Sequence, residues 1–362
     1  MDSVMLKLFL GLVLLGQFYY AQTAAPTISW NRAQQQPAAW YGSPEAVRIA
    51  DNLLLYQRDN GGWDKNIDMA APLDEAARNK LITEKSTGDT TIDNSATWSQ
   101  MRYLARVYTA TQLPRFRQAF DRALGYVFAA QYPNGGWPQY FPLRRGYYSH
   151  ITYNDDAMVG VLETLRFIAT GHPDYRFVSQ EHRDRARNAI QKGTQVILRS
   201  QVNVDGKLTV WCAQHDVETL KPAKARTYEH PSLSGHESAG IVRFLMGIER
   251  PPAEVVQSIE SAVEWLRQNQ LKGIALKRIP APGTEKGYDT VVETVPDAPP
   301  LWARFYEIGS NRPIFSGRDG IIRYSLNEIE YERRNNYRWF VDTPARLLER
   351  DYPAWKKRLL ER

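Results

Sequence analysis

The sequence predicts an all-α fold, an (α/α) toroid or barrel of antiparallel helix hairpins with a few short β segments in its loops. Apolar patterns typical of helices recur in pairs along the chain, and glycine-containing loops separate the pairs. Strand-like alternation is short and confined to these loops. Because consecutive helices usually pack against each other, repeated pairs of this length favour a ring whose long loops gather at one end.

Residues 1–25 have the composition of a secretory signal peptide. Lys7 is the only cation near the start, a short apolar run covers 8–15, and small residues that suit cleavage follow. An amphipathic helix is the alternative interpretation, and the run is too short to span a membrane. We therefore expect a secreted or periplasmic protein with no membrane contact after signal removal. No linker or low-complexity block interrupts residues 26–362, which predicts a single domain.

Three pairs of helices are predicted in the middle of the chain. Their apolar residues recur at intervals of three and four, as Trp98, Met101 and Ala105 do. A weak repeat accompanies the pairs, because helical patterns run into a glutamine and then a glycine-containing loop. The predicted helix pairs are 96–108 with 116–130, 157–168 with 183–200, and 238–246 with 253–268, and the strand-like stretches are 207–212 and 290–295.

Composition restricts the class of partner. Hydrophobic residues make up 43% of the 362 residues and charged residues 24%, which is typical of a folded protein. Cys212 is the only cysteine, so the chain forms no internal disulfide and no thiolate zinc site. The net charge of +6 favours an anionic polymer as partner. The arginines are scattered and no nucleic-acid motif occurs, so we expect no nucleic acid among the partners.

A polar cluster precedes an alanine at the start of the first helix in each pair. Such residues commonly cap helices by accepting hydrogen bonds from free backbone N–H groups, and capping explains any one cluster by itself. Equivalent places on neighbouring hairpins would instead bring all three clusters to one rim, which favours a functional site. The clusters are 91–96 (Thr-Ile-Asp-Asn-Ser-Ala), 152–157 (Thr-Tyr-Asn-Asp-Asp-Ala) and 234–239 (Ser-Gly-His-Glu-Ser-Ala).

Six ordered motifs closely resemble the family 10 polysaccharide lyases, which are pectate lyases with an (α/α) toroid fold. The resemblance covers roughly residues 40–345, and it is specific because the motifs occur together and in order. The motifs are 60–66 (Asn-Gly-Gly-Trp-Asp-Lys-Asn), 91–94, 134–139 (Asn-Gly-Gly-Trp-Pro-Gln), 152–158, 211–216 (Trp-Cys-Ala-Gln-His-Asp) and 222–229 (Pro-Ala-Lys-Ala-Arg-Thr-Tyr-Glu).

This resemblance implies a pectate lyase, with one catalytic domain over 26–362, that cleaves de-esterified polygalacturonate by β-elimination. The reaction removes the C5 proton beside a uronate carboxylate and expels the C4 oxygen, which gives 4,5-unsaturated oligogalacturonides. A hard cation on that carboxylate stabilises the intermediate, and Ca²⁺ binds oxygen ligands flexibly. Carried over by motif, Asp93 and Asp155 are the calcium ligands and Arg226 takes the C5 proton.

Further residues are implied as substrate-binding. Asn94 and Asp156 are secondary ligands or orienting groups, and Arg304, Arg318 and more weakly Lys224 pair with substrate carboxylates, because a guanidinium grips a carboxylate at two points. We expect an acidic polysaccharide as partner and a monomeric enzyme.

Several alternatives stay open at this point. Arg226 in an ion pair with Glu229 is the structural alternative to its catalytic role. Three tryptophans either stack on sugar rings or pack inside the toroid. His215 and His236 are interpreted as hydrogen-bonding groups rather than zinc ligands. The tryptophans are Trp63, Trp137 and Trp211.

Two other functions compete with the lyase. A glycosidase on the same toroid would use Asp93 and Asp155 as its acid and base. A secreted, non-catalytic binder of acidic polysaccharide fits the basic charge but leaves the Asp and Arg motifs unexplained. The lyase, the glycosidase and the non-catalytic binder differ in the products they form and in their dependence on calcium.

Overall fold

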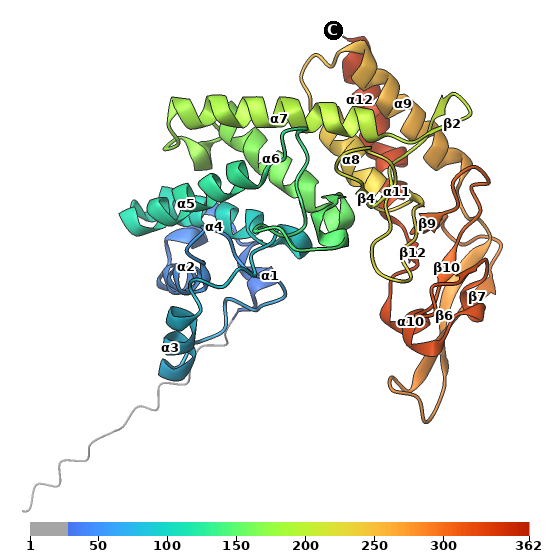
Figure 1. The fold of residues 1–362 in the computed structure, drawn as a ribbon, viewed down its shortest axis with the longest axis horizontal. Helices are drawn as coiled ribbons and strands as arrows, with labels where there is room; N and C mark the ends of the chain where they lie inside the picture. Colours follow the sequence, from blue (N-terminus) through green and yellow to red (C-terminus); the bar gives the residue numbers. More distant parts are fainter. Residues whose placement is uncertain (1–27, 362) are drawn as a thin grey trace, which may run out of the picture.

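The computed structural model describes residues 28–361, so the predicted signal peptide lies outside the described part. The fold is mainly helical with few and mostly short strands, which confirms the predicted helical class (Figure 1). Each predicted pair is present, and its helices begin and end within a few residues of the expected positions. The three hairpins are α4 (Trp98–Thr111) with α5 (Pro114–Ala130), α6 (Ala157–Thr170) with α7 (Gln180–Ser200), and α8 (Glu237–Met246) with α9 (Ala253–Gln268).

The hairpins follow one another side by side. Helix α4 contacts α6, and α6 contacts α8, so the first helices of the pairs form a continuous row. Helices α6, α7 and α8 connect the N-terminal helices to the C-terminal part of the chain (Figure 1). Closure of this row into a toroid stays a prediction. The remaining helices are α1 (Trp30–Ala33), α2 (Pro44–Tyr56), α3 (Glu75–Thr83), α10 (Tyr331–Asn336), α11 (Thr343–Arg346) and α12 (Tyr352–Leu360).

The longest strands form one antiparallel ribbon, β6 (Ile274–Pro280) with β7 (Tyr288–Thr294). The stretch predicted at 290–295 falls largely on β7, but neither strand alternates in burial, because the side chains of β7 are half-buried or exposed and most of those of β6 are exposed. The other strands have two residues each. They are β1 (Ile151–Thr152), β2 (Asn203–Val204), β3 (Lys207–Leu208), β4 (Gln214–His215), β5 (Leu233–Ser234), β8 (Trp302–Ala303), β9 (Phe305–Tyr306), β10 (Phe315–Ser316), β11 (Ile322–Arg323) and β12 (Phe340–Val341).

The repeated glutamines join each hairpin to the next. Gln57, Gln131 and Gln201 each donate their side-chain amide to two backbone carbonyls, at 2.8–3.0 Å. One carbonyl belongs to the loop that follows, and the other lies on the second helix of the next hairpin. Since a buried amide without partners is costly, this arrangement fixes where successive hairpins dock. The helix carbonyls belong to Ala119, Ala189 and Ser258.

The repeated tryptophans pack inside the fold. Trp63, Trp137 and Trp211 are fully buried. Each indole N–H donates to a carbonyl of the preceding helix, at 2.7–2.9 Å. Trp302 repeats the arrangement, with its N–H donating to a carbonyl of α9 at 2.8 Å. These rings therefore stabilise the junctions between hairpins and are not available for sugar stacking.

Removal of Trp137 will strongly destabilise the protein. Its indole N–H donates to the carbonyl of Val127 at 2.8 Å, and the ring is fully buried. Trp137→Ala leaves a cavity, so we expect a loss of ~3–5 kcal/mol in the free energy of unfolding. Trp137→Phe keeps most of the volume but leaves the hydrogen bond unmade, which costs ~1–2 kcal/mol. Denaturant unfolding measures both, and equal losses in the two variants would contradict this packing role.

No described helix is long and apolar enough to cross a membrane.

Candidate active site

Short antiparallel contacts align the starts of α4, α6 and α8. Strand β1, just before the second polar cluster, pairs with β4, and β5, which enters the third cluster, pairs with β9. Thr91 in the first cluster forms an isolated bridge with Tyr140. The turn at Asp93–Ser95 contacts the turn at Asn154–Asp156, and the latter contacts α8, so the three clusters lie next to one another along one rim.

The first two clusters share an uncommon backbone conformation. Asn94 and Asp155 have φ of 48° and 49°, in the left-handed region, and the next residues, Ser95 and Asp156, have positive φ as well. Asn and Asp tolerate this region better than most residues. By backbone position Asp155 therefore corresponds to Asn94, and the counterpart of Asp93 is Asn154. The carboxylate of Asp155 therefore lies one position later in its motif than the carboxylate of Asp93 does.

The two predicted calcium ligands are joined by an amide. The side-chain nitrogen of Asn154 donates to Asp155 Oδ2 at 2.7 Å and lies 3.4 Å from Asp93 Oδ1. Asp93 is only 2% exposed, and its Oδ2 accepts from Gln139 at 2.6 Å and from the ammonium of Lys65. Asp93 and Asp155 thus belong to one connected polar group, of which Asp155 is the more accessible member.

Arg304 lies inside this polar group rather than on the surface. Its Nη2 donates to Asp155 Oδ1 at 2.8 Å and to Glu237 Oε1 at 2.7 Å. The same nitrogen is 3.1 Å from the side-chain oxygen of Asn154, Oδ1. Although burial opposes it, the charge of Arg304 lowers the pKa of Glu237 to about 2. Both side chains are therefore charged near neutral pH.

The third cluster adds groups that could hold a cation. Asp155, His236 and Glu237 each offer one ligand atom, and these atoms lie within 4.8 Å of one another. With the oxygens of Asp93 and Asn154 nearby, the donor set is rich in oxygen and suits a hard divalent ion. Arg304 neutralises part of the negative charge, which predicts weak binding until a further carboxylate arrives.

Two sequence-predicted residues flank this group. Asp156 packs against Gly240 of α8, and withdrawal from water, with Glu237 and Asp155 nearby, raises its pKa to about 6 while His236 opposes the shift. Asn94 is exposed and donates to Asn66 at 2.8 Å. His236 hydrogen-bonds Thr343 at 3.0 Å, as its interpretation as a polar partner expects, and it also faces the acidic group.

Arg226 forms the ion pair that was its structural alternative. Its Nε and Nη2 donate to the two oxygens of Glu229 at 2.8 and 2.5 Å. Burial by itself would lower the pKa of Arg226, but the hydrogen bonds and charge of Glu229 raise it above the ordinary value. The side chain is still 43% exposed, so it is open to a ligand while paired.

Tyr337 connects Arg226 with the acidic group. Its ring centre lies 5.5 Å from the guanidinium carbon of Arg226 and 5.1 Å from that of Arg304. Its hydroxyl donates to Glu229 at 2.7 Å. Arg226 and Arg304 therefore border the same tyrosine, and Arg304 connects that tyrosine to the carboxylates of Asp155 and Glu237. The sequence analysis did not find Tyr337, because its segment carries no repeat or motif.

The two other predicted cations, Lys224 and Arg318, are both exposed. Lys224 is exposed and faces Gly320. Arg318 is 64% exposed, pairs with Glu332 at 3.1 Å, and lies 5.9 Å from the ring of Tyr228. Arg226 lies 5.0 Å from the same ring, so Arg226 and Arg318 both border Tyr228.

His215 is a buried structural residue. The backbone N–H of Cys212 donates to its Nε2 at 3.0 Å, so its Nδ1 carries the proton and donates to Leu220 O at 2.8 Å. Burial lowers the pKa of His215 to about 4. The folded protein therefore keeps His215 neutral down to about pH 4. The unfolded chain protonates the same side chain below the usual histidine pKa of about 6.5.

This burial predicts a loss of stability in acid. As pH falls from about 6.5 to about 4 the unfolded state gains the proton first, so His215 lowers the free energy of unfolding by about 2 kcal/mol at pH 5. His215→Gln will flatten the dependence in this window, as measured by urea unfolding at pH 7 and pH 5. The exposed His172→Gln is the control. Parallel pH curves for the two variants would count against the argument.

Comparison with known proteins agrees with this geometry. The profile described as pectic acid lyase matches residues 57–348. The chain belongs to this family. Family membership confirms the resemblance found in the sequence and makes the chain a polysaccharide lyase. A comparison with curated proteins gives no match.

Two solved structures of the family are similar over most of the chain. One is the family 10 polysaccharide lyase from Cellvibrio cellulosa, which is 33% identical, with 88% of this chain and 92% of that chain covered and a TM-score of 0.72. The other is its D189A mutant in complex with trigalacturonic acid, with the same identity and TM-score and 93% of that chain covered.

Proposed function

We propose that this family member is a pectate lyase that cleaves de-esterified polygalacturonate by calcium-assisted β-elimination. One observation carries the proposal: the guanidinium groups of Arg226 and Arg304 both lie against the ring of Tyr337, and Arg304 is bonded to the carboxylates of Asp155 and Glu237. The complex of the Cellvibrio lyase with trigalacturonic acid supports an acidic galacturonan as substrate. We also infer that the three helix hairpins form part of an (α/α) toroid.

The reaction needs a base at C5 and charge neutralisation at the uronate carboxylate. Arg226 takes the C5 proton, the electrons of the C5–H bond form the C4=C5 double bond, and the C4–O bond breaks with its electron pair on the leaving oxygen, which takes a proton from water. Asp155 and Asp93 would hold a calcium ion, which supplies electrostatic stabilisation of the carboxylate when bound. The products are a 4,5-unsaturated sugar on one fragment and a new end on the other.

The remaining predicted residues orient the polymer. Lys224 and Arg318 are exposed cations that suit carboxylates of neighbouring sugars, and Arg318 offers a planar fork. Arg304 fixes Asp155 and Glu237 through charged hydrogen bonds, so its contact with substrate would involve exchange of one of these partners. Asn94 and Asp156 complete the rim. We further propose that the enzyme acts as a secreted monomer.

A direct assay tests this function. Purified protein is incubated with polygalacturonate and Ca²⁺, and we expect a product that absorbs in the near ultraviolet, with the activity lost on addition of a chelator and restored by Ca²⁺. Highly methylated pectin is the comparison substrate. New reducing ends without ultraviolet absorbance would indicate a glycosidase, and binding without turnover would indicate a polysaccharide-binding protein.

A further inference from the structure

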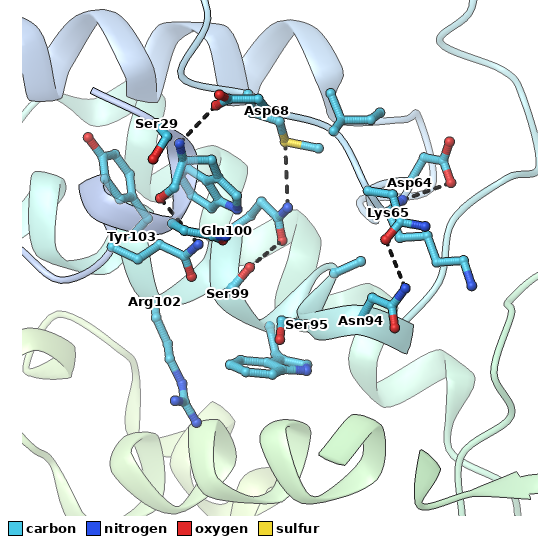
Figure 2. A pocket seen from close by; sticks show the side chains of 18 of the residues that line it. Ser29, Asp64, Lys65, Asp68, Asn94, Ser95, Ser99, Gln100, Arg102 and Tyr103 are labelled. Atoms are coloured by element: carbon cyan, nitrogen blue, oxygen red, sulfur yellow. Dashed lines mark hydrogen bonds between the residues drawn. The ribbon is translucent and has the colours of Figure 1, made fainter. Parts of the chain in front are cut away.

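Two cavities adjoin residues of the candidate active site, and they differ in the charges they offer. One, of about 640 Å³, lies between α1, the loop at 64–69 and the first half of α4 (Figure 2). Its Arg102 extends towards α6, where Nε donates to Thr164 at 2.8 Å and Nη2 to the carbonyl of Gly160 at 3.2 Å. Arg102 therefore serves the packing of α4 against α6. The other cavity, of about 370 Å³, lies beside the β6–β7 ribbon.

This second cavity lies between the ribbon and the segment that runs from α10 into β12 (Figure 1). Residues 337–340 of that segment line the cavity and also contact the active site. The ring of Tyr337 borders Arg226 and Arg304, and the carbonyl of Trp339 accepts from the backbone N–H of Arg304 at 2.7 Å. Neither Arg226 nor a proposed calcium ligand lines the cavity, so a ligand held there lies near the reacting groups without touching them.

The lining of the second cavity is basic. Four cations line it, whereas no aspartate or glutamate of the described residues does. Three of the cations pair with acids outside the lining, at 2.6–3.0 Å. Arg278 is the exception, because it is exposed and forms no ion pair and no side-chain hydrogen bond with any residue between 28 and 361. The four cations are Lys277, Arg278, Arg334 and Arg338.

The register of the ribbon directs Arg278 into the cavity. Arg278 pairs with Thr290, and Tyr288 and Val292 lie two positions to either side of Thr290, so all four side chains project from one face. Val292 packs against a buried hydrophobic cluster to which β12 contributes, so this face is turned towards the body of the protein. Arg278, Tyr288 and Thr290 line the cavity, and the guanidinium carbon of Arg278 lies 4.5 Å from the centre of the Tyr288 ring.

These groups match the chemistry of an acidic sugar. A guanidinium binds a carboxylate at two points, and stacking on Tyr288 orients the planar group of Arg278 before a ligand arrives. The Tyr288 ring and Leu276, which is 43% exposed, offer apolar surface to the C–H face of a sugar ring. The volume is within the range of ordinary small-ligand pockets. The lining therefore has a partner for the carboxylate and for the ring of a uronate.

We propose that this cavity is a second, non-catalytic binding site for the acidic polysaccharide, in which Arg278 pairs with a uronate carboxylate and Tyr288 packs on the sugar ring. The choice of ligand rests on the proposed function, which makes a polyuronate the substrate. A polymer held here keeps the enzyme on its substrate between cleavages. The site therefore increases affinity for long chains and leaves the chemical step unchanged.

Binding without turnover tests the site. Affinity electrophoresis of the full chain in gels that contain polygalacturonate and EDTA gives dissociation constants for the wild type, Arg278→Gln and Tyr288→Ala. We expect the dissociation constant to rise on the order of tenfold in Arg278→Gln, because one charged hydrogen bond is lost, and to rise in Tyr288→Ala as well. Arg278 is exposed, and Tyr288→Ala keeps the backbone carbonyl that accepts from Tyr331 at 2.9 Å, so both variants should fold.

The matched control is Arg312→Gln. Arg312 is also an exposed arginine over a tyrosine, 3.5 Å from the centre of the Tyr324 ring, but it lies outside the cavity. We expect it to bind polygalacturonate as the wild type does, and an equal loss in Arg312→Gln would reduce the effect to general charge and overturn the site. Gels with poly-glutamate in place of the polysaccharide complete the control. Equal dependence on Arg278 there would show a polyanion surface without sugar recognition, which also contradicts the proposal.

Kinetics separate this inference from the proposed function. In Arg278→Gln we expect KM on polygalacturonate to rise and both kcat and KM on trigalacturonate to stay unchanged, whereas a loss on the trimer would place Arg278 in the catalytic site and overturn a separate one. The gels need no turnover, so weaker binding by Arg278→Gln supports the site even if the wild type proves inactive as a lyase. Wild-type binding by both Arg278→Gln and Tyr288→Ala contradicts the site and leaves the lyase assay unaffected.

Discussion

Arg226→Ala will lower kcat on polygalacturonate on the order of a thousandfold, because removal of a general base typically costs 10²–10⁴. The side chain is 43% exposed and its partner Glu229 keeps the hydroxyl of Tyr337, so the fold should be retained. Initial rates from ultraviolet absorbance measure the loss, and thermal unfolding is the control. A variant that keeps more than a tenth of the rate would exclude Arg226 as the base.

The ion pair between Arg226 and Glu229 also predicts how kcat depends on pH. Glu229 raises the pKa of Arg226, so it disfavours the neutral form that a base requires. Because only the neutral guanidine can take a proton, we expect kcat to rise with pH in the alkaline range. Glu229→Gln will lower the pKa of Arg226 and therefore move this rise of kcat towards lower pH. The conservative change keeps the size of the side chain and its bond to Tyr337. An unchanged pH profile would indicate that Arg226 acts as a fixed positive charge and that another group takes the proton.

Asp155→Ala will remove most of the calcium-dependent activity, again on the order of 10²–10³, since it deletes the accessible carboxylate of the acidic group. Arg304 remains paired with Glu237 at 2.7 Å, so no buried charge is left without a partner and the protein should fold. Rates are measured across a calcium titration. Calcium binding by calorimetry, with and without trigalacturonate, gives a readout that does not depend on turnover.

The matched control for Asp155 is Asp184→Asn, an exposed carboxylate on α7 that pairs with Arg187. It should leave both activity and calcium dependence unchanged. Asp155→Asn, which keeps one oxygen donor, should recover part of the rate at high calcium. If Asp155→Ala responds to calcium and chelator as the wild type does, the ion binds elsewhere and the proposed ligand set is wrong.

The sequence alone determined the helical class, the three helix pairs and the three polar clusters. These features are local: an apolar residue every three or four positions specifies a helix that buries one face, and Asn and Asp accept the left-handed turn before α4 and α6. The ordered motifs likewise identified the family, which residues 57–348 bear out.

Only the tertiary structure decided which way the key side chains face. The sequence left the repeated tryptophans open between sugar stacking and packing, and their hydrogen bonds to preceding helices place them inside. Arg304 was expected as a surface clamp, yet it lies among Asp155 and Glu237, and Tyr337 links it to Arg226. The bonds of Arg304 to Asp155 and Glu237 join residues 149 and 67 positions apart, and local pattern carries no information about them because the packing of separate hairpins creates them.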